Sequence, residues 1–241
     1  MISLLALDSS TEALTLALSA PSERFFFEGE GGAKASAEIL PQLQELLARA
    51  GLRGEQLDAI AFGRGPGAFT GLRTACAVAQ GLALGWNKPV LAIDSLMLVA
   101  EDARLQAGSL AGPIWVLMDA RMNEIYAGCY QWAGDRWQVL DAPALYSPEA
   151  LKAHWQGQPP GAVCGSALQP FAEALALGGD LPAWPETRSR AAALASLAEQ
   201  AWASGDKLDA AEAMPLYVRD KVALTTAERA AVAAAAQGAQ A

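Results

Sequence analysis

The order of apolar runs repeats along this chain of 241 residues, and the repetition constrains the fold more than any single motif does. An apolar strand at 2–7 ends at Asp8 and is followed by two more strands, a helix, a strand and a helix. The same order begins again at 114–118, where the apolar run ends at Asp119. Hairpin strands with interleaved helices indicate an α/β protein with mixed sheets. The pattern therefore predicts two lobes of related fold.

We place the first lobe at residues 1–107, the second at 108–225 and a tail at 226–241. The boundary falls in a stretch of small residues that contains glycine. The tail is rich in alanine and has no bulky apolar face, so we expect it to fray or to be disordered.

A glycine-rich segment at 63–73 follows the strand predicted at 58–62 and leads into a helix predicted at 74–85. Gly65 and Gly67 permit a tight turn, with Thr70 as a possible helix cap. The first N–H groups of the helix could bind an anion. The spacing matches neither the P-loop nor the dinucleotide fingerprint, so a structural turn is the commoner interpretation and phosphate contact the alternative.

Small residues recur every four positions along this helix and would let another backbone approach closely. The first row comprises Gly71, Ala75, Ala79 and Ala83, and the second comprises Ala77, Gly81 and Gly85. We expect one row to face the chain's own core and the other to be available to a helix of another chain.

The composition excludes several classes of function. A net charge of −9 argues against unaided binding to nucleic acid, although a complex with another subunit stays possible. The three cysteines form no CxxC pair, so neither a disulfide framework nor a zinc knuckle is indicated. The N-terminus has no basic leader, and no apolar run reaches membrane-spanning length, so we expect a cytoplasmic protein.

Two turns contain the candidate cofactor-binding residues. Asp8 with Ser10 and Thr11 could bind a metal–phosphate group, but a hydrogen-bonded turn is the commoner interpretation. Asp119 poses the same question, and an ion pair with Arg121 is the commoner interpretation there.

The sequence offers little catalytic equipment. His154 is the single histidine and lies in a polar, surface-like stretch. No carboxylate cluster has the spacing of a metal site. We therefore predict no catalytic residue, no metal and no resident cofactor.

Several segments together resemble the bacterial TsaB (YeaZ) family. They are the start at 5–13, the glycine-rich segment at 63–73, the residues at 80–83, the stretch at 119–126 and the late residues at 215–219. The glycine-rich segment is specific, the others support it, and the resemblance extends to about Lys221.

The resemblance implies a two-lobe fold of the actin/hexokinase/Hsp70 (ASKHA) superfamily, built from duplicated ribonuclease H-like units. It also implies a non-catalytic partner subunit, required with TsaD and TsaE for transfer of the threonylcarbamoyl group from threonylcarbamoyl-AMP to tRNA. The acceptor is the adenosine beside the anticodon in tRNAs that decode ANN codons. The tRNA would be contacted only through the complex.

The chain departs from its superfamily at two places. The transferase relatives carry a His-x-x-x-His metal motif where this chain has residues 36–40, which contain no histidine. Kinases of the superfamily carry a phosphate loop where this chain has residues 119–122, whose side chains would obstruct close approach of a phosphate. ATP binding of the usual kind is therefore not expected, while a nucleotide at a partner interface stays open.

In this family, helices of the first lobe contact TsaD, and the same face can form a homodimer. From this we predict a partner interface on two helices, at Ile39, Leu43, Leu47, Gly71, Ala75, Cys76, Ala79 and Ala83. The alternative function is a small-molecule kinase or ATPase of the same superfamily. A metallopeptidase is nearly excluded by the single histidine.

Overall fold

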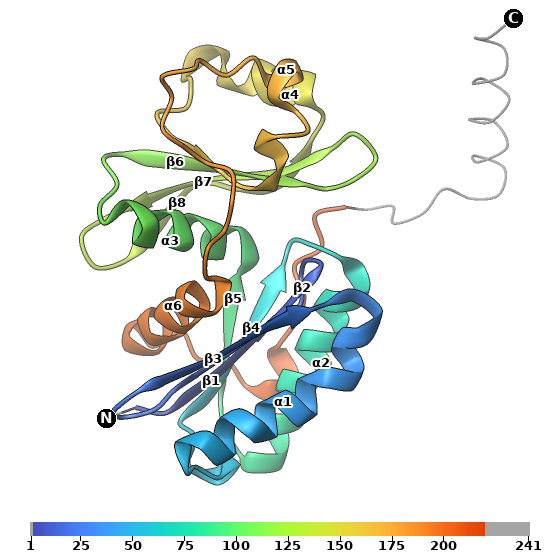
Figure 1. Ribbon diagram of the computed structural model, residues 1–241, viewed down its shortest axis with the longest axis vertical. Helices are drawn as coiled ribbons and strands as arrows, with labels where there is room; N and C mark the ends of the chain where they lie inside the picture. Colours follow the sequence, from blue (N-terminus) through green and yellow to red (C-terminus); the bar gives the residue numbers. More distant parts are fainter. Residues whose placement is uncertain (1, 220–241) are drawn as a thin grey trace, which may run out of the picture.

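The computed structural model describes residues 2–219, apart from the side chain of Ala33 (Figure 1). The tail predicted for 226–241 lies outside these residues. Two five-stranded sheets form the two lobes, in the orders β3-β2-β1-β4-β5 and β10-β9-β6-β7-β8. These are the same order read from opposite edges, so the predicted duplication is confirmed.

The first sheet is mixed because its hairpin strands precede its crossover strands. Strand β1 pairs antiparallel with β2 and parallel with β4. All five residues of β1 are buried, as expected for a central strand made only of apolar residues before its last aspartate. The strands are β1 (Leu4–Asp8), β2 (Ala13–Ser19), β3 (Arg24–Glu30), β4 (Ala59–Gly65) and β5 (Val90–Asp94).

The second sheet repeats this arrangement with shorter crossover strands. Strand β6 pairs antiparallel with β7 and parallel with β9. Both β9 and β10 have only two residues. The strands are β6 (Pro113–Asp119), β7 (Ile125–Trp132), β8 (Trp137–Tyr146), β9 (Val163–Cys164) and β10 (Ala183–Trp184).

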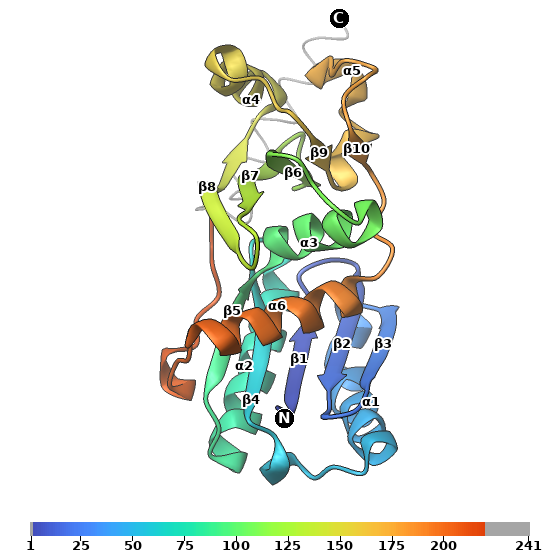
Figure 2. The ribbon, with the colours of Figure 1, turned by 90° about the vertical axis from the view of Figure 1, so that its left-hand side faces the viewer.

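Helices cover both faces of each sheet. Helices α1 (Ala35–Ala50) and α2 (Phe69–Trp86) lie on one face of the first sheet, and α6 (Arg190–Ser204) crosses the other (Figure 2). Helix α3 (Ser95–Ala107) lies between the lobes, and α4 (Pro148–His154) and α5 (Ala172–Leu175) lie beyond the second sheet (Figure 1). Short 3₁₀ helices occur at Gly32–Lys34, Gly54–Gln56, Trp155–Gly157, Ser166–Leu168 and Ala210–Glu212.

Helix α6 corrects the predicted division of the chain. The boundary at 107/108 does fall between the two sheets. However, α6 packs against β1, β2, β3 and β5 of the first sheet and against α3. Its buried residues, such as Leu194 and Leu197, join one core with Leu4 and Val116, which come from different lobes. Helix α6 therefore belongs with the first lobe in space.

The predicted interface residues also need correction, because all eight are buried in the chain's own core. Ile39 and Ala79 are 0% exposed, and Leu47, at 8%, is the most exposed of the seven residues that are not glycine. Gly71 is buried as well, and a Cβ there would lie 1.8 Å from the Ser9 carbonyl oxygen. One core cluster under the first sheet contains the other seven, namely Ile39, Leu43, Leu47, Ala75, Cys76, Ala79 and Ala83.

The second row of α2 has the opposite environment. Ala77, Gly81 and Gly85 are exposed, and Leu84 is 78% exposed. Of the two rows, the first therefore faces the core and the second faces outward. None of the helices within residues 2–219 combines the length and apolar character that crossing a membrane requires.

Candidate functional site

A cleft of about 710 Å³ lies between the lobes. Its lining comes from the turn after β1, the loop before α2, the start of α3, the turn after β6, the start of α6 and the segment at 216–219. Both of the aspartate-ending strands, β1 and β6, point their carboxyl ends at it. The duplicated order therefore brings the predicted candidate turns together.

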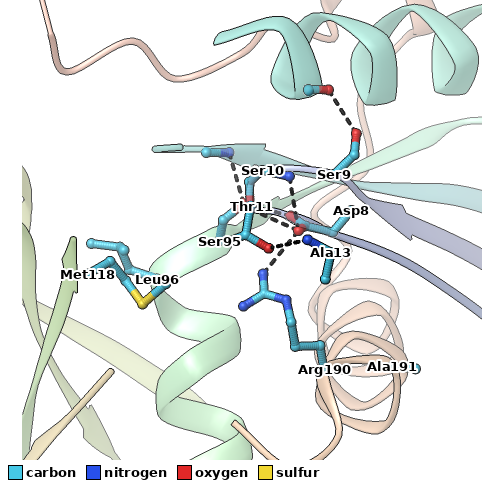
Figure 3. Close-up of polar contacts among 12 residues, drawn as sticks. Asp8, Ser9, Ser10, Thr11, Ala13, Ser95, Leu96, Met118, Arg190 and Ala191 are labelled. Atoms are coloured by element: carbon cyan, nitrogen blue, oxygen red, sulfur yellow. Dashed lines mark hydrogen bonds and ion pairs between the residues drawn. The ribbon is translucent and has the colours of Figure 1, made fainter. Parts of the chain in front are cut away.

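Asp8 lies beneath the cleft and is completely buried. Its Oδ1 accepts hydrogen bonds from Ser10 Oγ at 2.8 Å and from Arg190 Nη2 at 3.0 Å. Its Oδ2 accepts from Ser95 Oγ at 2.8 Å (Figure 3). A Cβ at position 63 would lie 1.7 Å from Oδ2, so Gly63 leaves room for the carboxylate. Both oxygens are thus engaged, as a structural hydrogen-bonded turn requires.

Ser10 and Thr11 hold the turn that follows Asp8. The Ser10 carbonyl accepts from Ala68 N at 2.7 Å, and Thr11 Oγ1 accepts from Ala13 N at 3.2 Å. Gly67 packs directly on Ser10, where a Cβ would lie 2.2 Å from the carbonyl oxygen. The glycine-rich segment therefore serves as a structural turn packed against the turn after β1.

The predicted cap of α2 differs from the observed one. Ala68, rather than Thr70, is the N-cap of α2, and it makes no side-chain cap. At the start of α3, Asp94 is the cap and accepts from Leu96 N at 2.8 Å. The Ser95 hydroxyl is free to reach Asp8 because Asp94 supplies the cap.

Asp119 is held by its own turn. Its Oδ1 accepts from Arg121 N at 2.7 Å, and its Oδ2 lies 3.6 Å from Arg121 Nη1. The predicted Asp119–Arg121 ion pair is therefore confirmed. Arg121 also contacts Glu12 at 3.3 Å, which links the turns of the two lobes across the cleft.

The segment at 216–219 connects the lobes beside the cleft. Leu216 N donates to Arg64 O at 2.6 Å in the first lobe. Arg219 Nη2 donates to Ala120 O at 2.8 Å, and its Nη1 lies 2.7 Å from Glu124 Oε2 in the second lobe. These late residues were noted in the sequence only through the family resemblance, because an irregular segment has no periodicity that would reveal its contacts.

A second buried link joins the lobes behind the cleft. Tyr130 Oη donates to Asp94 Oδ2 at 2.9 Å. Burial raises the pKa of Asp94, opposed by its hydrogen bonds from Tyr130 and the backbone of Met97 and Leu96. Burial and the neighbouring Asp94 carboxylate raise the pKa of the Tyr130 hydroxyl well above its usual range. Tyr130 is therefore a neutral donor that locks β7 to the start of α3.

His154 lies away from the cleft. Its Nε2 is 2.6 Å from Asp141 Oδ2, and its ring packs against Trp115 and Tyr146. It is not among the cleft residues. Among residues 2–219, no three His, Cys, Asp or Glu side chains form a group that could hold a metal ion.

Arg190 is the cleft residue that sequence reasoning missed. Its position next to Asp8 depends on the packing of α6 across the first sheet, which local patterns do not reveal. The one available signal was an arginine at the start of a helix that is otherwise rich in alanine and leucine.

Comparisons with known proteins find TsaB (YeaZ) proteins both by sequence and by structure. A family model described as TsaD, tRNA N6-adenosine threonylcarbamoyltransferase, matches residues 31–240. The tRNA threonylcarbamoyladenosine biosynthesis protein TsaB of Escherichia coli K12 is 30% identical over 244 residues, covering 91% of this chain and 96% of that protein. TsaB of Haemophilus influenzae is 44% identical over 127 residues, so that match spans 52% of each protein.

Two solved structures from Pseudomonas aeruginosa are similar over most of the chain. One is an uncharacterized protein with similarity to peptidase YEAZ, with a TM-score of 0.81, 35% identity, and coverage of 91% of this chain and 100% of that one. The structure of YeaZ has a TM-score of 0.79 and 35% identity, and the match covers 90% of this chain and 100% of that one. A polyphosphate/ATP-glucomannokinase from Arthrobacter has a TM-score of 0.51 and 14% identity, and the match covers 84% of this chain and 100% of that one. This similarity shows the fold alone. The predicted two-lobe actin/hexokinase/Hsp70-like fold is confirmed.

Proposed function

Because this chain belongs to the TsaB (YeaZ) family of tRNA threonylcarbamoyladenosine biosynthesis proteins, we propose that it is a partner subunit without catalytic residues of its own. In this proposal a TsaD-type transferase carries out threonylcarbamoyl transfer to tRNA. A TsaE-type ATPase joins the complex, and tRNA is contacted only through it. The site of action is the cytoplasm.

The observation that carries the proposal is the match along nearly the whole length of TsaB of Escherichia coli. The geometry of the cleft supports the absence of catalysis. The carboxylate oxygens of Asp8 accept hydrogen bonds from Ser10, Ser95 and Arg190, and Asp119 is held by Arg121. A general base needs a carboxylate that can reach a substrate proton, whereas the carboxylates of Asp8 and Asp119 accept hydrogen bonds from within the chain.

The outward row of α2 is the surface we assign to the partner. A Cβ added at Gly81 or Gly85 would meet nothing within 4 Å, so neither glycine is required for packing within the chain. Leu84 and Leu40, on α2 and α1, are large apolar side chains that are 78% and 48% exposed. Small residues beside exposed leucines let a partner helix approach closely and bury apolar surface. A second copy of the chain would compete for the same face.

A test measures complex formation with a purified TsaD-type transferase by size-exclusion chromatography with light scattering. Gly81→Trp places a bulky ring on the outward row, and we expect it to abolish the complex while the melting temperature changes little. Ala153→Trp, at an exposed position on α4, is the matched control and should bind normally. A Gly81→Trp variant that binds as well as the control would contradict this assignment of the interface.

A further inference from the structure

The inter-lobe cleft contains a buried guanidinium group whose N–H groups are only partly used. Arg190 is 7% exposed and is the first residue of α6. Its Nη2 donates to Asp8, whereas its Nε has no hydrogen-bond partner among residues 2–219. Figure 3 shows the second terminal nitrogen turned away from Asp8. A buried N–H without an acceptor destabilises the folded chain, so this arrangement points to an acceptor that comes from outside it.

No neighbouring group among residues 2–219 accepts from this Nε. The hydroxyl groups of Ser10 and Ser95 both donate to Asp8. The other arginines of the cleft, Arg121 and Arg219, have their own carboxylate partners, and neither has a buried nitrogen left unpaired. Because a guanidinium group donates two parallel N–H bonds to a carboxylate or a phosphate, an acid group is the acceptor that fits Arg190.

The start of α2 favours an anion at the same place. Ala68 and Phe69 line the cleft, and no side chain caps this helix. The first-turn N–H groups and the helix dipole make the N-terminus of an 18-residue helix electropositive. Ser10 joins the two features, because its carbonyl binds Ala68 N while its hydroxyl shares Asp8 with Arg190.

The remaining lining determines what the acid group is attached to. Leu96 and Met118 line the same cleft as Arg190, and Phe69, Tyr126 and Tyr217 extend the apolar wall. The volume of about 710 Å³ is in the range of small-molecule sites. Aromatic and sulfur-containing walls suit a flat, apolar body.

We propose that the cleft binds a small molecule with one carboxylate or phosphate group and a flat apolar body, with the acid group on Arg190. The binding needs no divalent cation, since protein donors already occupy the oxygens of Asp8. This inference goes beyond the partner role and does not depend on it.

The probes for the test share one body and differ in their head group. Calorimetry on the full chain, in the presence of EDTA, compares 2-naphthoate and 2-naphthyl phosphate with neutral 2-naphthamide. We expect at least one acid to bind with a Kd below about 1 mM, and the amide to bind at least about tenfold more weakly. Comparing the two acids, and adding inorganic phosphate as competitor, distinguishes a carboxylate ligand from a phosphate ligand. Equal affinity of acids and amide, or no binding, overturns the proposal.

Two variants locate the site. Arg190→Lys keeps a cation beside Asp8 but removes the planar fork, so acid affinity should fall at least about tenfold while amide affinity stays unchanged. The exposed Arg53→Lys is the matched control and should bind like the parent chain. Thr187→Trp places a bulky ring in the cleft from a partly exposed position, so it should abolish acid binding. This variant replaces Arg190→Lys in the test if Arg190→Lys does not fold. Unchanged acid binding in the folded variants overturns the proposal.

Discussion

Gly71 of α2 packs against Ser9 and Gly81 is exposed, so the same substitution has opposite consequences at the two positions. A Cβ at Gly71 would lie 1.8 Å from the Ser9 carbonyl oxygen, whereas at Gly81 it would meet nothing within 4 Å. We expect Gly71→Ala to destabilise the chain by about 1–3 kcal/mol through overpacking. Gly81→Ala should stabilise it by about 0.5–1 kcal/mol, because alanine restricts the unfolded chain. Urea unfolding measures both, and equal effects would show that the described packing of α2 is wrong.

Cys129 illustrates how burial controls reactivity. The side chain lies between sheet and helices, and burial, helped by the nearby Asp141 carboxylate, raises the pKa of its thiol to about 11. At pH 8 its thiolate fraction is therefore about a hundredth of that of an ordinary thiol, and it increases as the pH rises toward 11. Alkylation of Cys129 by iodoacetamide, followed by peptide mass spectrometry, should be at least about a hundredfold slower in the native chain than in concentrated urea. Similar rates in both conditions would contradict this environment.

At the residue scale, sequence and structure agree where contacts are local. The Asp119–Arg121 pair forms within one turn, so its spacing along the chain was enough to predict it. The Arg190–Asp8 pair spans 182 positions and exists because α6 returns to the first sheet. Nothing in either short segment specifies the other, so the key residue of the cleft could not be predicted.

The two faces of α2 make a prediction at the element scale. Ala79 is 0% exposed in the core, whereas Ala77 is exposed. Ala79→Leu should therefore destabilise the chain by about 1–3 kcal/mol. Ala77→Leu should change stability by less than about 0.5 kcal/mol but weaken binding to a TsaD-type transferase. Thermal unfolding and a binding titration on both variants separate the two roles. Loss of partner binding in a stable Ala79→Leu variant would reverse the assignment of the rows.

Helices and strands could be predicted where the apolar pattern in the sequence is long. They could not be predicted where packing between distant segments determines the structure. The apolar runs of β1 and β6 and the stripe of α1 are confirmed. Strand β1 is buried along its whole length, residues 114–117 of β6 are buried, and α1 is buried along one face. Strand β10 has two residues and exists only through its pairing with β9. For α2, small residues on both faces left no hydrophobic stripe to set the orientation of the helix, so the buried row was assigned to the wrong side.

At the scale of the whole molecule, one buried carboxylate ties three elements together across the two lobes. Glu101 of α3 is 0% exposed and accepts from Arg104 at 2.7 Å, from Trp137 Nε1 of β8 at 2.9 Å and from Ser196 Oγ of α6 at 2.6 Å. Glu101→Ala leaves these donors without their acceptor, and we expect a cost of about 3–5 kcal/mol in urea unfolding.

The matched control for that variant is Glu30→Ala. Glu30 pairs with Lys34 on the surface, where the two side chains are 75% and 66% exposed. Solvent screens such a pair, so its loss should cost less than about 1 kcal/mol. Comparable losses in the two variants would mean that the buried network does not join the lobes in the way described.

The most direct test of the partner role is reconstitution of threonylcarbamoyl transfer to unmodified tRNA. The assay contains a TsaD-type transferase, a TsaE-type ATPase and the adenylate-forming enzyme, with and without this chain. We predict that modification depends on adding the chain, that Gly81→Trp fails to support it, and that Ala153→Trp supports it fully. Undiminished modification in the absence of the chain would contradict its role as a required partner.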